Sequence, residues 1–335
     1  MLVDPQRVHE EAIVIDGHCD TLLQVEEGLH RYHPRPARSF WEESSSGHID
    51  FPRLVRGGVT CQVMALYIEP QYKPAISARR TLELLDAAYR LFEESSDFVL
   101  ATKSRDIVEA KQNRKVSALL SIEGGEAVEG SLSVLRSFYR LGVRAMGLTW
   151  NQRNDIADGV GEKSGSSLTE FGVALVKEME RLGMLVDVSH LSESSFWALD
   201  RVAERPYIAS HSNSRALCSH PRNLDDRQIE ALASKGGVIG VVFAPGFVSD
   251  DPERVSLQAL VDHIDHIVKV AGIDHVGLGS DFDGYGVREG APAVMKDVSE
   301  LPLLTQELAH RGYGREDIEK ILGKNWLRVY EEVIG

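Results

Sequence analysis

The 335-residue chain has few cysteines, no long apolar run and no excess of basic residues, and each shortage argues against a class of protein. Three cysteines, Cys19, Cys61 and Cys218, are too few and too scattered for a disulfide framework or a cysteine-based zinc site. No apolar run approaches the roughly 18 residues of a membrane span. A formal net charge of −14 argues against nucleic acid or an anionic membrane surface as a partner, because phosphate-binding proteins need clustered Lys and Arg.

The amino-terminal residues lack a basic region followed by an apolar stretch, so we expect no secretion signal and a cytoplasmic location. No linker rich in Pro, Gly or Ser divides the sequence, and 43% of its residues are hydrophobic, which is enough for a sizeable core. Barrels of alternating strands and helices reach this length as one unit. We therefore expect residues 1–335 to form a single domain.

Short apolar runs alternate with amphipathic helical patterns along the chain. In residues 167–183 and 257–272, apolar side chains recur at three- and four-residue steps, which predicts helices. The apolar runs are nearly continuous, as in parallel strands covered on both faces. This alternation predicts parallel βαβ units, and eight of them fit an α/β fold, the (β/α)8 TIM-like barrel. The predicted strands are residues 12–16, 59–68, 116–122, 143–150, 184–189, 207–210, 238–244 and 275–280.

An open doubly wound sheet would show the same alternation of strands and helices, but no GxGxxG motif follows the first predicted strand.

Residues 23–48 form a long insertion after the first predicted strand, and we expect this loop to shape specificity, as βα loops of barrels often do. Residues 315–333 predict a closing helix. His263 and His266 lie off the apolar stripe of their helix, so we expect both to be solvated.

Residues that can bind metal or transfer protons end several of the predicted strands. The carboxyl ends of barrel strands meet at one face, so these side chains are expected to share one site. The six residues are His18, Asp20, Glu123, His190, His211 and Asp281.

The chemistry of these residues favours a metal site, with structural alternatives left open. The spacing of His18 and Asp20 places both on one face of an extended strand, where they can point at one ion or be satisfied by local hydrogen bonds. Glu123 is costly to bury unless a cation pairs with it, and a bridging position between two metals would meet that cost. Capping of the next helix is its alternative. Three imidazoles and two carboxylates suit zinc in a catalytic site, although a single strand-end histidine more often serves structure.

The sequence resembles the membrane dipeptidase family, also called renal dipeptidases, of the metal-dependent amidohydrolase group. The resemblance runs from IDGHCDT through SIEGG, DVSH, SHSNSRALCSHPRNL and GSDFDG to KNWLRV, nearly the whole chain. It implies a barrel that binds two zinc ions and hydrolyses dipeptides, L-L and also L-D, through a hydroxide held between the metals. His18 and Asp20 would hold one zinc, His190 and His211 the other, and Glu123 would bridge them.

The same resemblance assigns roles beyond the metals. Arg222 of HPRN corresponds to the arginine that grips the substrate carboxylate, and Asp281 to the catalytic aspartate, with Asp283 the less favoured of the SDFDG pair. Animal members carry a histidine in an LTH motif that helps to stabilise the oxyanion, where this sequence reads LTW. An indole donates one hydrogen bond and cannot titrate. Either Trp150 or the following Asn151 would take over, or the substrate set differs.

The expected partners are small dipeptides, with no nucleic acid and no membrane, and the resemblance suggests a homodimer. The secretion signal and lipid-anchor tail of the animal members are not seen, so we expect a soluble microbial member. Two other functions stay open. One is an amidohydrolase acting on cyclic amides, lactones or phosphotriesters, although those enzymes commonly bridge their metals with a carbamylated lysine. The other is a non-catalytic binding protein, which would have little need to bury so much negative charge.

Overall fold

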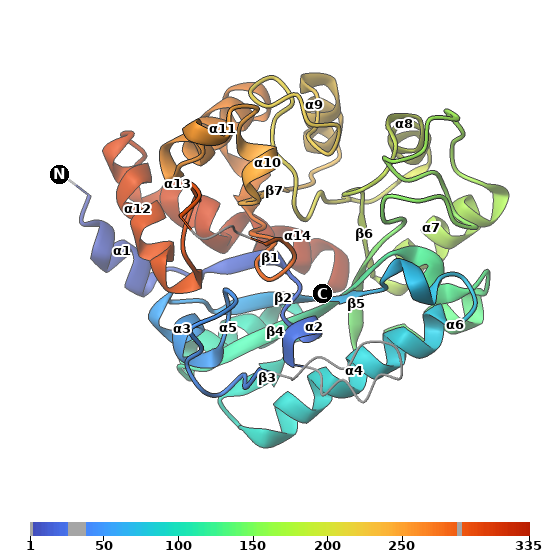
Figure 1. Ribbon diagram of the computed structural model, residues 1–335, viewed down its shortest axis with the longest axis horizontal. Helices are drawn as coiled ribbons and strands as arrows, with labels where there is room; N and C mark the ends of the chain where they lie inside the picture. Colours follow the sequence, from blue (N-terminus) through green and yellow to red (C-terminus); the bar gives the residue numbers. More distant parts are fainter. Residues whose placement is uncertain (1–2, 26–37, 287–289) are drawn as a thin grey trace.

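The computed structural model describes residues 3–25, 38–286 and 290–335. Parallel strands lie at its centre in the order β6-β5-β4-β2-β1-β8-β7, and β3 pairs with the first half of β4. Figure 1 shows the strands in the middle of the molecule, with helices around them. The strands are β1 (Ile15–Cys19), β2 (Cys61–Tyr67), β3 (Phe98–Leu100), β4 (Val116–Glu123), β5 (Val143–Gly147), β6 (Leu185–Asp187), β7 (Ile239–Val241) and β8 (Val276–Leu278).

Residues 207–210 close the sheet into a ring. Ile208 pairs with Asp187 of β6 and Ala209 with Ile239 of β7, both in the parallel sense. Backbone hydrogen bonds join the segment to both neighbours. Because β1 already pairs with β8, the ring is complete and the fold is the predicted TIM-like barrel.

The helices pack their apolar faces on the outer side of the ring, where one large cluster of buried side chains joins helices and strands. Helix α7 has typical caps at both ends: it begins after Thr169, whose hydroxyl accepts from Gly172 N, and it ends before Gly183, which has a φ of 74°. The α-helices are α1 (Pro5–Glu11), α2 (Leu22–Val25), α3 (Phe51–Arg56), α4 (Ser77–Glu94), α5 (Ser104–Gln112), α6 (Leu132–Arg140), α7 (Glu170–Leu182), α8 (Glu193–Val202), α9 (Asp226–Ser234), α10 (Pro245–Val248), α11 (Leu257–Ala271), α12 (Leu301–His310), α13 (Arg315–Glu319) and α14 (Asn325–Ile334).

Some local predictions need correction. The sequence pattern does not predict β3, which has three residues and pairs with β4 outside the ring. Residues 207–210 make two bridges instead of a full strand. His263 is fully buried rather than solvated, because its ring accepts from Ser214 N at 3.2 Å and its Nε2 lies 2.9 Å from Val248 O. A helical stripe cannot reveal that segments distant in sequence cover a second face of the helix.

The predicted insertion at residues 23–48 is described only at its two ends, since residues 26–37, with His30 and His33, lie outside the described part. Near the carboxyl-terminal end of the insertion, Trp41 packs against Phe51 with ring centroids 5.1 Å apart.

Among the helices of the described ranges, none has both the length and the apolarity that crossing a bilayer requires.

The helix predicted at residues 315–333 is present as α13, a π-helical turn at Lys320–Lys324, and α14. A second buried cluster joins five residues of α14 to residues at or near the amino-terminal ends of most of the ring's strands. A helix outside a barrel can contact only a few adjacent strands, so we place α14 across the amino-terminal end of the ring. The carboxyl ends are therefore left for the site.

Trp326 of α14 fills the space beside β1 and β8. Its Nε1 donates to Leu278 O at 2.9 Å, and the indole is fully buried. Gly17 and Gly277 make room for the ring, because a Cβ at either position would lie 2.5 Å from an indole atom. These two glycines are therefore required by packing on adjacent strands.

Gly277→Ala should lower the free energy of unfolding by about 1–3 kcal/mol, because the added methyl group overlaps the Trp326 indole. Gly246→Ala is the matched control, since a Cβ there meets no atom within 4 Å. Urea titration of both variants and the wild type measures the difference. Equal midpoints for Gly277→Ala and Gly246→Ala would contradict this account of the packing.

Candidate active site

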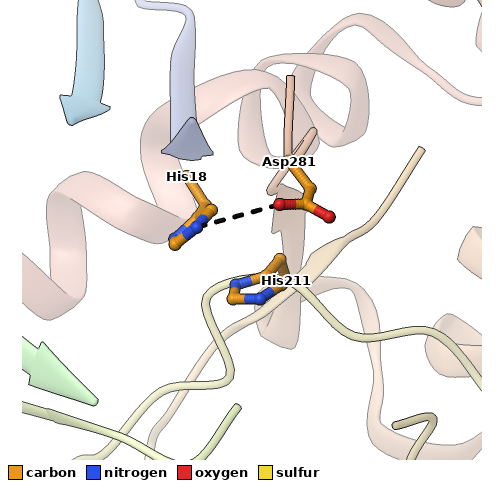
Figure 2. A group of neighbouring side chains, drawn as sticks. All are labelled: His18, His211 and Asp281. Carbon is orange, nitrogen blue, oxygen red and sulfur yellow. Dashed lines mark ion pairs between the residues drawn. The ribbon is translucent and has the colours of Figure 1, made fainter. Parts of the chain in front are cut away.

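The six strand-end residues converge at the carboxyl end of the ring. The Nε2 atom of His18 lies 3.4 Å from Glu123 Oε2 and 3.6 Å from Asp20 Oδ2. It lies 3.9 Å from Asp281 Oδ1. Figure 2 shows His18 at the end of β1 with Asp281 beside it and the ring of His211 below them. One carboxylate oxygen of Glu123 thus belongs to a group centred on His18.

The other carboxylate oxygen of Glu123 faces a second group. Its Oε1 lies 2.9 Å from His190 Nε2 and 3.8 Å from His211 Nε2. The two imidazole Nε2 atoms are 2.9 Å apart. Glu123 therefore lies between two sets of potential ligands, and all the side chains involved are at least four-fifths buried.

Hydrogen bonds outside the cluster fix the tautomers of His190 and His211. Asn151 Oδ1 lies 2.8 Å from His190 Nδ1, and a carbonyl oxygen can only accept, so Nδ1 carries the hydrogen. The Ser210 hydroxyl donates to Asp187 and therefore accepts from His211 Nδ1 at 2.8 Å. Each imidazole then presents an unprotonated Nε2 to the cluster.

This convergence of lone pairs is what a cation site needs. Two Nε2 atoms and Glu123 Oε1 have no hydrogen between them, so they repel unless a cation lies among them. The buried atoms His18 Nδ1, His18 Nε2 and Asp20 Oδ1 also lack hydrogen-bond partners within the described ranges. Imidazole and carboxylate ligands suit first-row divalent metals. Three overlapping ligand groups could hold such ions, and they comprise His18, Asp20 and Glu123; Glu123, His190 and His211; and His18, His211 and Asp281.

The protonation states agree with metal binding. Burial lowers the pKa of His190 to about 3 and that of His211 well below its ordinary value, so both rings are neutral near pH 7 and able to bind a cation. Burial also lowers the pKa of His18, but the carboxylates of Glu123 and Asp20 outweigh it and raise the net value well above the ordinary one. A metal would therefore displace a proton from His18, as metal ligands require.

Backbone conformation aims Asp281 and His190 into the cluster. Their φ angles of 62° and 73° lie in the left-handed region, which residues other than glycine adopt at a cost. Hydrogen bonds from Asp281 N to His18 O and from Asp20 N to Phe282 O fasten the turn to β1. Burial and then the charge of Asp20 raise the pKa of Asp281 well above its ordinary value. The carboxylate of Asp281 is therefore more basic than that of an exposed aspartate.

A cavity of about 780 Å³ opens above the cluster. Trp150 and Tyr67 form part of its wall, with ring centroids 5.3 Å apart, and the Trp150 ring lies 5.9 Å from that of His190. Phe247 lines the cavity as well, and Leu23 at the start of the predicted insertion also reaches it. The cavity is large enough for a small organic molecule.

Arg222 is 5% exposed in the cavity wall. Its Nη2 donates to His211 O at 3.1 Å and its Nη1 to Ser212 Oγ at 3.3 Å. Its Nε finds no hydrogen-bond partner in the part of the chain that the structure describes. Burial lowers the pKa of Arg222 to about 10, so the guanidinium stays charged at neutral pH. A buried cation with a spare donor suits an anionic group.

Trp150 and Asn151, which the sequence predicts to contact the substrate, both line the cavity. The Lys73 ammonium lies 5.1 Å from the centroid of the Trp150 ring. Asp283, the less favoured aspartate, points away from the cluster, because its carboxylate accepts from Thr21 Oγ1 at 2.8 Å and Arg38 Nη2 at 2.9 Å.

Sequence reasoning identified Trp150 and Asn151 but missed other residues that orient the ligands or line the wall. Asp187 and Ser210 hold the ring of His211, and the aromatic rings of Tyr67 and Phe247 line the cavity. The one available signal is the position of Ser210, directly before His211. A serine beside a histidine is too common a pattern to indicate this contact.

Comparisons with known proteins identify the family of this chain. The model of the membrane dipeptidase family, peptidase family M19, matches residues 3–334. Dipeptidase aclJ of Aspergillus oryzae is 34% identical over 332 residues, which cover 95% of this chain and 77% of that protein.

Two solved structures share both fold and sequence with the chain. One is a metallopeptidase from Rhodobacter sphaeroides bound to a phosphinate mimic of the dipeptide L-Ala-D-Ala. It is 29% identical to this chain with a TM-score of 0.83, and the alignment covers 96% of this chain and 100% of the relative. The M19 metallopeptidase dipeptidase AC has a TM-score of 0.85 at 29% identity, over 97% and 99% of the two chains. Because the family match spans nearly all of its residues, this chain belongs to the membrane dipeptidase family, the metallopeptidase family M19.

Proposed function

We propose that the protein is a zinc-dependent dipeptidase that hydrolyses the peptide bond of L-L and L-D dipeptides. The observation that carries the proposal is the position of Glu123 between two groups of metal-capable side chains. These groups lie at the base of a cavity whose wall includes Arg222. Family membership supports the dipeptidase activity. The phosphinate mimic of L-Ala-D-Ala bound by the Rhodobacter relative supports the L-D specificity.

His18 and Asp20 would hold one zinc ion, His190 and His211 the other, and Glu123 both. When bound, the two ions would supply a water that is deprotonated near neutral pH and would polarise the scissile carbonyl. Neutral imidazoles with outward Nδ1 hydrogen bonds suit this role, because the outer bond fixes the ring and raises its basicity.

The chain's own residues would then bind, orient and protonate the substrate. Arg222 would hold the free carboxylate of the dipeptide through its guanidinium. Asp281, whose Oδ1 lies 3.9 Å from His18 Nε2 at the edge of the cluster, would accept the proton of the attacking water and pass it to the leaving amine. The amide oxygen of Asn151 is engaged by His190, which leaves its NH2 group as a neutral donor toward the cavity. Trp150 would chiefly form the wall.

The purified protein should hold about two zinc ions per chain, lose activity on chelation and recover it with added divalent metal. His190→Ala should weaken one site, and Glu123→Ala should weaken both, because the two carboxylate oxygens of Glu123 face different ligand groups. His266→Ala is the control, since His266 pairs with Asp226 on the surface. Metal analysis of the dialysed proteins measures this, and full activity after exhaustive metal removal would reject the proposal.

Asp281→Asn should lower kcat by roughly 10²- to 10⁴-fold, as expected for loss of a general acid-base group. The amide keeps the size of the side chain but cannot accept the proton. Metal content should stay close to that of the wild type, which separates proton transfer from metal loss. Steady-state kinetics together with metal analysis decide the point, and a rate near wild type would remove Asp281 from this role.

Arg222→Met should reduce kcat/KM for L-Ala-L-Ala and L-Ala-D-Ala by about 10- to 100-fold, from loss of a charge-assisted contact of roughly 1.5 to 3 kcal/mol. The same dipeptides with amidated C-termini serve as matched controls. They should be poor substrates of the wild type and little affected by the substitution, because they lack the carboxylate. Equal losses on free and amidated dipeptides would show that Arg222 does not recognise the carboxylate.

A further inference from the structure

Asp187, at the end of β6, is a buried carboxylate that takes no direct part in the proposed chemistry. It is 4% exposed. Its Oδ1 accepts from Ser189 N at 3.0 Å and Ser210 N at 2.9 Å, and its Oδ2 accepts from Ser210 Oγ. Because every one of these neighbours donates, Asp187 acts as an acceptor at both oxygens.

The Ser210 hydroxyl links Asp187 to the imidazole of His211 by two hydrogen bonds. The hydroxyl has a single proton, which it donates to Asp187, so its oxygen accepts from His211 Nδ1 at 2.8 Å. The hydrogen on Nδ1 leaves the lone pair of the neutral ring on Nε2. That atom faces His190 Nε2 and Glu123 Oε1.

We infer that Asp187 is a positioning residue that holds His211 in its metal-binding tautomer by way of the Ser210 hydroxyl. The inference rests on the proposed role of His211 as a metal ligand. Outer-shell carboxylates that orient a ligating histidine are a general device of metal sites. Here a serine hydroxyl stands between the carboxylate and the imidazole.

The direction of the hydrogen bonds makes Asp187→Asn a sharp test. The backbone N–H groups of Ser189 and Ser210 require the amide oxygen at the Oδ1 position, so the NH2 group must face Ser210 Oγ. The hydroxyl then accepts from the amide and donates its own proton to His211 Nδ1. The neutral ring consequently carries its hydrogen on Nε2, where it cannot bind a metal.

Asp16 of β1 provides a matched control. It is also buried and accepts from a serine near the end of the neighbouring strand, Ser280, at 2.7 Å from N and 2.6 Å from Oγ. The Ser280 hydroxyl lies 3.2 Å from the backbone oxygen of His18 instead of an imidazole nitrogen. Gln62 donates to Asp16, and its Oε1 lacks a hydrogen-bond partner among the described residues, so its amide can turn to accommodate Asp16→Asn.

The experiment follows the release of zinc from the zinc-loaded protein to a colorimetric chelator. Asp187→Asn should release one of two zinc equivalents about 10- to 100-fold faster than wild type, the usual range for loss of an outer-shell partner. Asp16→Asn should release both at close to the wild-type rate. Release by Asp187→Asn at the wild-type rate would overturn the inference, whereas a wild type that binds no zinc would instead overturn the proposed function.

A double-mutant cycle tests the path through Ser210. If the hydroxyl carries the effect, Ser210→Ala and the double variant Ser210→Ala, Asp187→Asn should release zinc at the same rate. Acceleration by Asp187→Asn that persists without the hydroxyl would contradict the path. If Asp187→Asn does not fold, Ser210→Ala alone decides: loss of the acceptor of Nδ1 should speed release severalfold, and an unchanged rate would refute the inference.

Discussion

Mutual repulsion among hydrogen-bond acceptors is the constraint on which the rest of this structure depends. The Nε2 lone pairs of His190 and His211 and the Oε1 atom of Glu123 meet without hydrogens between them, and burial removes the water that would screen them. Such a set does not assemble by its own attraction. The closed ring, the left-handed backbone at His190 and Asp281 and the outer hydrogen bonds all act to hold it in place.

The convergence of the six strand-end residues could be predicted because it depends on topology alone. In a parallel barrel every strand ends at the same face, so a residue type that recurs at strand ends must gather there. The exact strand limits matter little for that argument. The prediction holds although residues 207–210 do not form a full strand, since two β-bridges suffice to place His211.

What could not be predicted depends on contacts between segments that are distant in sequence. His263 is buried by the segment at Ser214 and by the end of α10 at Val248, which no helical period reveals. In the sequence, Asp187 looks like an ordinary strand residue, because nothing there indicates its contact with the Ser210 hydroxyl. The amide oxygen of Asn151 is engaged by His190, although the sequence suggests only a donor toward the substrate. Hydrogen-bond direction is set by geometry that neighbouring residues in the chain do not encode.

The pairing of β1 with β8 has a consequence for how the protein forms. Asp16 and Ser280 are 264 positions apart, so this contact is among the slowest kind to establish, because chain entropy must be lost before it stabilises anything. The cluster needs His18 from one side of that junction and Asp281 from the other. A refolding chain would therefore acquire high-affinity metal binding only when the ring closes, and the time course of metal uptake would report closure of the barrel separately from the earlier formation of its helices.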